Sequence, residues 1–208
     1  MKIKTIVTLP FGENCYIVSK QNTGVIIDPG DSADKISLYL TQNNIKPKAI
    51  LLTHGHFDHV GAVNELKEEY NLPVYANIYE KGILSDPSKI YVFGGGGTAV
   101  KVDNWFEDGD VLKFDDLTFT AIHTPGHTRG SSCFLLESNL LSGDTLFRES
   151  VGRCDLPGGS FEQILDSIRN KIFSLDDKTL VYPGHGEMTD VGYEKINNPY
   201  VTGELYGA

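Results

Sequence analysis

The stretch Ala49-Ile50-Leu51-Leu52-Thr53-His54-Gly55-His56-Phe57-Asp58-His59 joins an apolar run to three imidazoles and a carboxylate. The apolar residues are typical of a buried strand, and the polar residues follow where that strand ends. Packing gives no reason to gather three histidines within six positions. Neutral imidazole and carboxylate are ligands for zinc, iron and manganese. The stretch therefore predicts one half of a metal site.

The remaining histidines and one aspartate extend this pattern. His127 and His185 each follow a Pro-Gly pair after a β-prone run, and Asp144 follows Leu140-Leu141 and Ser142-Gly143. A single loop histidine is more often a surface or core residue, but loops that follow successive strands can bring ligands to one sheet edge. Only His123 lacks such a setting among the six histidines, and we interpret it as a core histidine or one that supports a ligand.

These motifs resemble a known family. His54, His56, Asp58 and His59, spaced as H-x-H-x-D-H and followed by His127, Asp144 and His185, resemble the signature of the metallo-β-lactamase superfamily. Segments 123–128 and 143–147 are similar to glyoxalase II and its short bacterial relatives, the hydroxyacylglutathione hydrolase-like hydrolases. The resemblance runs from residue 14 to about residue 199. It implies an α+β fold, a four-layer αββα sandwich of two mixed β-sheets with helices on both outer faces, in a single domain over residues 1–208.

The resemblance also implies a ligand set for two divalent metal ions, with zinc expected first and iron or manganese as alternatives. Its members are His54, His56 and His127 for one ion, Asp58, His59 and His185 for the other, and Asp144 as a bridge. Asp58 and Asp144 are the expected catalytic carboxylates. Asp58 has the alternative role of a proton acceptor, and Asp144 that of a loop aspartate that accepts hydrogen bonds from backbone amides.

The implied reaction is hydrolysis of a thioester, such as S-lactoylglutathione or a related 2-hydroxyacyl thiol ester. A divalent metal lowers the pKa of bound water to about 7, so a hydroxide that bridges both ions can attack the carbonyl carbon. A thiolate leaves readily, so neither a side-chain nucleophile nor a strong general acid is required.

Two departures from full-length glyoxalase II leave glutathione specificity open. Only 23 residues follow His185 (208 minus 185), so we expect no C-terminal glutathione-binding helical domain. Loop 151–159 has an Arg-x-Asp pattern where the longer enzymes have a lysine and a tyrosine that contact glutathione. Arg153 is a candidate anchor for a substrate carboxylate because its guanidinium is planar and bidentate. The alternative is an ion pair with Asp155.

Three other functions are compatible with these residues. A persulfide dioxygenase would hold a single iron through His54, His127 and Asp144, two histidines and a carboxylate. A lactonase would use the metal site on a substrate that has no thiol carrier. A binding module would keep the fold without catalysis, and the complete set of ligands argues against it.

Composition excludes several classes of protein and suggests where the protein acts. The 208 residues are 40% hydrophobic and carry a net charge of −10, which argues against nucleic-acid binding. No apolar stretch approaches the roughly 18 residues of a membrane span, and the N-terminus has no signal-peptide pattern. Three cysteines make a disulfide framework improbable. We expect a cytoplasmic enzyme that acts on a small molecule, and the sequence leaves the oligomeric state open.

Periodicity predicts alternating strands and helices. The expected strands are residues 2–8, 15–19, 24–27, 49–53, 111–114, 117–124, 132–136 and 179–182. The expected helices are residues 33–43, 60–70 and 161–172, the last opened by a capping box of Ser160 and Gln163. Asp115-Asp116 predicts a hairpin turn, and the four glycines 94–97 predict a flexible loop rather than a phosphate-binding one.

Overall fold

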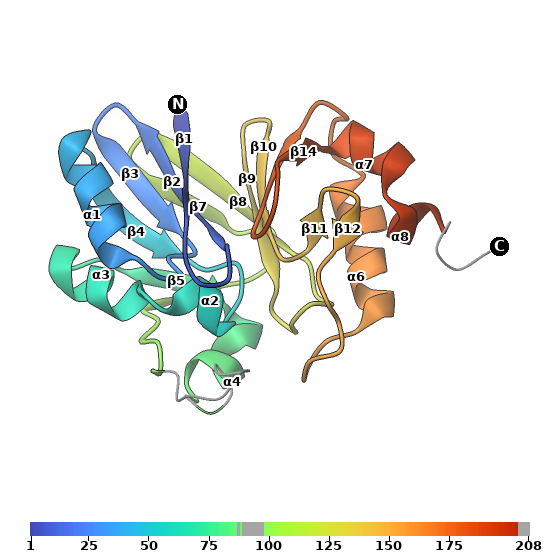
Figure 1. Ribbon diagram of the computed structural model, residues 1–208, viewed down its shortest axis with the longest axis horizontal. Coiled ribbons are helices and arrows are strands. Elements are labelled where there is room, and N and C mark those ends of the chain that lie inside the picture. The colour runs from blue at the N-terminus through green and yellow to red at the C-terminus, as the bar shows by residue number, and fades with distance from the viewer. Residues whose placement is uncertain (87, 89–97, 204–208) are drawn as a thin grey trace.

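The structure, a computed structural model, describes residues 1–86, 88 and 98–203. The glycine run 94–97 therefore lies outside the described residues. Two six-stranded sheets pack face to face, and helices cover the outer face of each sheet (Figure 1). The predicted sandwich of two mixed sheets with outer helices is confirmed.

The first sheet follows chain order from edge to edge. Its strands are β1 (Lys2–Val7), β2 (Asn14–Lys20), β3 (Thr23–Ile27), β4 (Lys46–Leu51), β5 (Val74–Asn77) and β6 (Asn104–Phe106). The pairs from β1 to β3 are antiparallel, and those from β3 to β6 are parallel. Parallel neighbours need a crossover. Helix α1 (Ala33–Gln42) supplies one between β3 and β4, and α3 (Val63–Tyr70) supplies another between β4 and β5.

The second sheet has the order β14-β13-β10-β9-β8-β7. Its strands are β7 (Val111–Phe114), β8 (Leu117–His123), β9 (Ser132–Leu136), β10 (Asn139–Gly143), β13 (Leu180–Pro183) and β14 (Thr189–Asp190). Only β10 and β13 pair in parallel. Their crossover contains α6 (Phe161–Ser167), which continues into the π-helical turn η2 (Ile168–Ile172).

Shorter elements complete the described chain. They are α2 (Phe57–Val60), η1 (Ile78–Glu80), α4 (Lys81–Leu84), the hairpin β11 (Leu146–Phe147) and β12 (Ser150–Val151), α7 (Val191–Asn197) and α8 (Pro199–Thr202). None of the helices in the described ranges has the length and apolar character needed to cross a bilayer.

The central strands of the first sheet are buried on both faces, which explains their almost unbroken apolar sequences. On β4, Ala49 and Leu51 point into the layer between the sheets, while Ile50 and the following residue Leu52 pack under α1 and α3. A third cluster lies under α6, where Ile164 and Ile168 are fully buried. The run that precedes the histidine cluster is therefore fixed on both sides, so its end is held firmly in place.

The predicted helix 60–70 is wrong at its start. The chain forms α2, passes through Gly61 and Ala62, and begins α3 only at Val63. The Ala62 amide donates to the carbonyl of Pro29 at 2.9 Å, so the local backbone is anchored to the loop after β3. The predicted helices 33–43 and 161–172 and the hairpin at Asp115 are confirmed, the first helix ending at Gln42. Half of the predicted capping box forms: Ser160 Oγ accepts from the Gln163 amide, but the Ser160 amide donates to the Gly126 carbonyl.

Phe134 on β9 is fully buried between the sheets, with its ring centroid 5.5 Å from that of Phe106 on β6. We predict that Phe134→Ala lowers the free energy of unfolding by about 3–5 kcal/mol, because it opens a cavity in the shared core. Urea denaturation measures this change. The control Leu38→Ala, at a side chain that is 57% exposed, should change it by less than about 0.5 kcal/mol. Equal effects of the two substitutions would contradict this description of the core.

Candidate metal centre

The loops that follow four strands carry all seven residues predicted for the site to one edge of the sandwich. His54 and His56 follow β4, Asp58 and His59 lie on α2, His127 follows β8, Asp144 follows β10, and His185 follows β13. The residues form two groups with Asp144 between them. The chain thus gathers side chains from positions 54 to 185 at one place.

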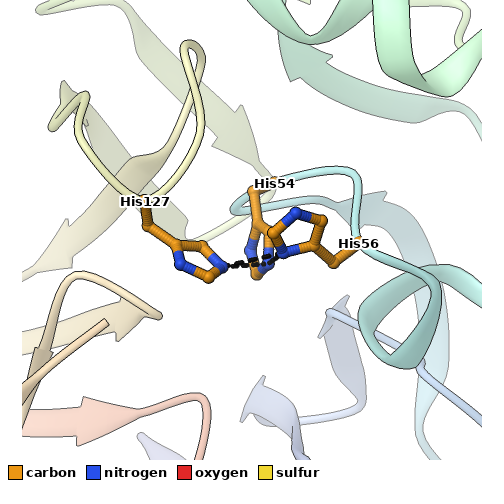
Figure 2. A group of neighbouring side chains, drawn as sticks. All are labelled: His54, His56 and His127. Atoms are coloured by element: carbon orange, nitrogen blue, oxygen red, sulfur yellow. Dashed lines mark hydrogen bonds between the residues drawn. The ribbon is translucent and has the colours of Figure 1, made fainter. Parts of the chain in front are cut away.

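The first group consists of His54, His56 and His127, whose ring nitrogens point toward one another (Figure 2). His54 Nε2 lies 3.1 Å from His56 Nδ1, His56 Nδ1 lies 2.8 Å from His127 Nε2, and the third side is 3.2 Å. Burial and the neighbouring imidazoles lower the pKa of His56 to about 3, and burial also lowers the pKa of His54 and His127. Three neutral imidazoles therefore converge on one point, as a divalent cation requires.

The second group consists of Asp58, His59 and His185. His185 Nε2 lies 3.2 Å from Asp58 Oδ2, and both side chains are partly exposed. Burial opposes charge on both residues. The hydrogen bond between them nevertheless lowers the pKa of Asp58 and raises that of His185. This group is more polar and more open than the first.

Asp144 lies between the two groups, with Oδ2 near a histidine of each group and Oδ1 near His59 of the second. Its Oδ1 lies 3.3 Å from His59 Nε2, and its Oδ2 lies 3.5 Å from His127 Nε2 and 3.7 Å from His185 Nε2. Burial favours the neutral acid, but the neighbouring imidazoles, above all His59, hold the pKa of Asp144 well below its ordinary value. Among the described residues, His59 Nε2 and Asp144 Oδ1 are buried without a good hydrogen-bond partner. A buried nitrogen and a buried oxygen without hydrogen-bond partners can both offer electron pairs to a cation, so they fit a metal site.

Asp28 orients His59 from behind, and the sequence prediction missed it. Its carboxylate accepts hydrogen bonds from the Thr53 amide at 2.7 Å, the Thr53 hydroxyl at 2.5 Å and His59 Nδ1 at 3.0 Å. When Nδ1 of His59 donates to Asp28, Nε2 is left free to face Asp144. His127 is held in the same way, with Nδ1 2.7 Å from the carbonyl of Arg153. Partners of this kind fix the orientation of metal-binding histidines.

Glu80, at the end of η1, joins the two loops of the first group. Its Oε2 accepts a hydrogen bond from the Gly55 amide at 2.7 Å, between the two histidines that follow β4. Its Oε1 accepts from the Thr128 hydroxyl at 2.7 Å and the Gly130 amide at 2.8 Å, next to His127. The side chain is buried, which raises its pKa, and these donors compensate for the burial. Sequence reasoning missed Glu80 because no motif surrounds it.

A cavity of about 380 Å³ opens onto the two groups. His56, Asp58, His127, Asp144 and His185 form its polar floor, and three aromatic side chains stand around it: Phe11, Phe57 and Phe147. Phe11 and Phe57 meet edge to face with ring centroids 4.7 Å apart. A small substrate can therefore reach the candidate ligands from solvent and contact apolar walls.

The surroundings of Arg153 and His123 bear on the roles that the sequence predicted for these two residues. Arg153 lines the cavity, and its guanidinium forms the ion pair with Asp155 that was the alternative to a substrate anchor, at 2.7 and 2.8 Å. The role of Arg153 as a substrate anchor stays a prediction. His123 is neither a core residue nor a neighbour of the ligand groups. It is half-buried, stacks on Tyr79 with ring centroids 5.2 Å apart, and lies 2.9 Å from the Arg129 carbonyl.

Glu80→Gln replaces one carboxylate oxygen by an amide that donates hydrogen bonds, so at least one link to Gly55, Thr128 or Gly130 is lost. We predict that this substitution weakens zinc binding by about 10- to 100-fold, as does loss of comparable supporting contacts elsewhere. Competition with a chromophoric chelator measures the affinity. Glu65→Gln, an exposed position on α3, is the matched control. Unchanged zinc affinity in Glu80→Gln would show that Glu80 does not position the histidines.

Comparisons with known proteins agree with this geometry. The family profile described as Metallo-beta-lactamase superfamily matches residues 8–185. "Probable metallo-hydrolase YqgX" of Bacillus subtilis is 38% identical over 98% of this chain and 99% of its own. "Hydroxyacylglutathione hydrolase GloC" of Haemophilus influenzae is 34% identical over 97% of this chain and 98% of its own.

Solved structures resemble the whole chain as well. The BLEG-1 B3 metallo-beta-lactamase superposes with a TM-score of 0.92 at 38% identity, covering 97% of this chain and 100% of its own. TTHA1623, solved in a di-iron-bound form, superposes with a TM-score of 0.85 at 36% identity, covering 95% and 99%. The fold, the convergent histidines and these relatives lead to one conclusion: the chain belongs to the metallo-β-lactamase superfamily.

Proposed function

We propose that the protein is a binuclear metallohydrolase that cleaves a thioester, such as S-lactoylglutathione or a related 2-hydroxyacyl thiol ester. The observation that carries this proposal is the place of Asp144, one oxygen toward His59 and the other toward His127 and His185. A carboxylate so placed can serve two ions at once. The likeness to a hydroxyacylglutathione hydrolase supports the choice of thioester.

The ligands divide between two ions in this proposal. His54, His56 and His127 hold the first, Asp58, His59 and His185 hold the second, and Asp144 bridges them. Bound divalent ions lower the pKa of a water molecule to about 7 and polarise a substrate carbonyl. Zinc suits an imidazole-rich set, and the di-iron form of TTHA1623 makes iron the first alternative.

The residues of the chain supply the remaining requirements. The His185 hydrogen bond holds the pKa of Asp58 below its ordinary value although burial opposes this, so the carboxylate stays ionised at neutral pH, as a metal ligand must be. The aromatic side chains Phe11, Phe57 and Phe147 give the acyl group an apolar contact and limit access of water. A thiolate leaving group needs no strong acid from the protein.

Steady-state hydrolysis of S-D-lactoylglutathione by metal-replete protein tests the proposal. We expect kcat/KM of about 10⁴ M⁻¹s⁻¹ or more, the usual range for a true substrate. His56→Ala and Asp144→Ala should abolish this activity while the far-UV circular dichroism stays unchanged. Asp116→Ala, in the distant β7–β8 turn, should leave the activity unchanged. Full activity in either site variant would refute the assignment.

Chelation should also destabilise the fold, because the ligands come from loops that a bound ion holds together. A ligand present at about 1,000 times its Kd contributes about 4 kcal/mol, which corresponds to about 10 °C in Tm for a chain of this size. We predict a fall of this order when EDTA is added to the metal-replete protein. The Tm of Asp144→Ala should respond less. A Tm of the wild type that EDTA does not change would contradict the proposed ligand set.

A persulfide dioxygenase is the alternative that the same residues allow. His54, His127 and Asp144 would then hold one iron, and His127 Nε2 does lie 3.5 Å from Asp144 Oδ2. Metal analysis of protein purified in air without chelator separates the two functions. One iron per chain with oxygen uptake on a persulfide would replace the hydrolase proposal. Lactones and a β-lactam, assayed beside the thioester, test the other hydrolase reactions of the superfamily.

A further inference from the structure

A second cavity of about 540 Å³ lies beside the cavity that opens onto the candidate metal ligands. The two cavities share His56 and Leu156 as lining residues. The second cavity has apolar walls from Tyr79, Ile83 and Pro157. His56 thus lies at the border of the two cavities. It is the one predicted metal ligand that lines the second cavity, whereas five predicted ligands line the first.

Arg129 brings a positive charge to the second cavity. The peptide group that joins it to Gly130 is held at both its carbonyl and its amide. The Arg129 carbonyl lies 2.9 Å from His123 Nε2, and the following Gly130 amide donates to Glu80. Its aliphatic stem runs along Gly158, where a Cβ would lie 3.4 Å from the arginine Cγ. The side chain is therefore supported along the cavity wall.

No carboxylate of the described residues forms an ion pair with the Arg129 guanidinium. Arg153, near the first cavity, is neutralised by Asp155 instead. Glu80 also lines the second cavity, but the amides of Gly55 and Gly130 and the Thr128 hydroxyl already occupy its oxygens. In a chain of net charge −10, this cavity presents the exposed side chain of an arginine that no carboxylate in the described part of the chain neutralises.

We propose that the second cavity binds the thiol carrier of the substrate and that Arg129 binds a carboxylate of that carrier. The guanidinium can donate two parallel hydrogen bonds to a carboxylate, and such bonds are among the strongest in proteins. The proposal rests on the thioesterase function. It also gives the orientation of the bound substrate. The acyl group lies in the first cavity, beside Phe11 and Phe147, and the sulfur lies near His56. The carrier extends through the second cavity past Tyr79 to Arg129.

Two substrates with the same acyl group and different carriers test the assignment. S-D-lactoylglutathione carries carboxylates, and S-D-lactoyl-N-acetylcysteamine carries none. Arg129→Ala should raise KM for the first by about tenfold or more, as expected for loss of a charged hydrogen-bond partner, with kcat unchanged. KM for the second should change less than twofold. Arg129→Lys keeps the charge but loses the paired donors, so it should fall between the wild type and Arg129→Ala.

Lys113→Ala is the matched control, because it removes one positive charge from an exposed position on β7. It lies about 20 Å from the site, beside the hairpin turn at the far end of β8. It should leave both KM values unchanged. Equal changes in KM for the two substrates in Arg129→Ala, or none for either, would overturn the carrier assignment.

A binding experiment keeps this test separate from the proposed reaction. If the wild type hydrolyses neither thioester, the thioesterase proposal fails, and calorimetric binding of S-hexylglutathione then tests Arg129 alone. Binding to the wild type at least about tenfold tighter than to Arg129→Ala would support the carboxylate site. Equal affinities, or no binding to the wild type, would overturn it.

Discussion

The site depends on a single electrostatic constraint, the placement of the Asp144 carboxylate among imidazoles from three other segments of the chain, which follow β4, β8 and β13. Its two oxygens face His59 on one side and His127 and His185 on the other. Burial alone would favour the neutral acid, yet its charged neighbours hold the pKa of Asp144 low. An ionised carboxylate in that position is stabilised by positive charge nearby, which the proposed metal ions would supply. The ends of strands β4, β8, β10 and β13 bring the candidate metal ligands together around it.

Two buried carboxylates that lie behind the candidate ligands hold the loops in their positions relative to one another. Asp28 holds Thr53 and His59, and Glu80 holds Gly55, Thr128 and Gly130, so each ties together backbone from distant parts of the chain. Each interaction replaces hydration that burial removes, which is why these carboxylates are tolerated in the interior. The sheets supply rigid strand ends, and these hydrogen bonds set the orientation of the loops that leave them.

The sequence predicted the parts of this arrangement that are dense along the chain. Three histidines in six positions and two Pro-Gly-His turns mark their own loops, and the double-sided burial of β4 is visible in its apolar run. Glu80 and Asp28 could not be found in that way, because their partners lie tens of residues away. The strands β5 and β6, only four and three residues long, are too short to show a period.

The two arginines show the same limit for substrate binding. The sequence drew attention to Arg153, but its charge is neutralised by a residue two positions further on, whereas Arg129 lines a cavity and forms no ion pair with any described residue. Whether an arginine is neutralised depends on the carboxylates near it in space, and these neighbours are known only from the folded structure.

The most direct measurement is a crystal structure of the zinc-loaded protein with anomalous scattering recorded at the zinc edge. We predict two anomalous peaks, one among His54, His56 and His127 and one among Asp58, His59 and His185, with one oxygen of Asp144 on each. A single peak held only by His54, His127 and Asp144, or two ions that Asp144 does not bridge, would contradict it.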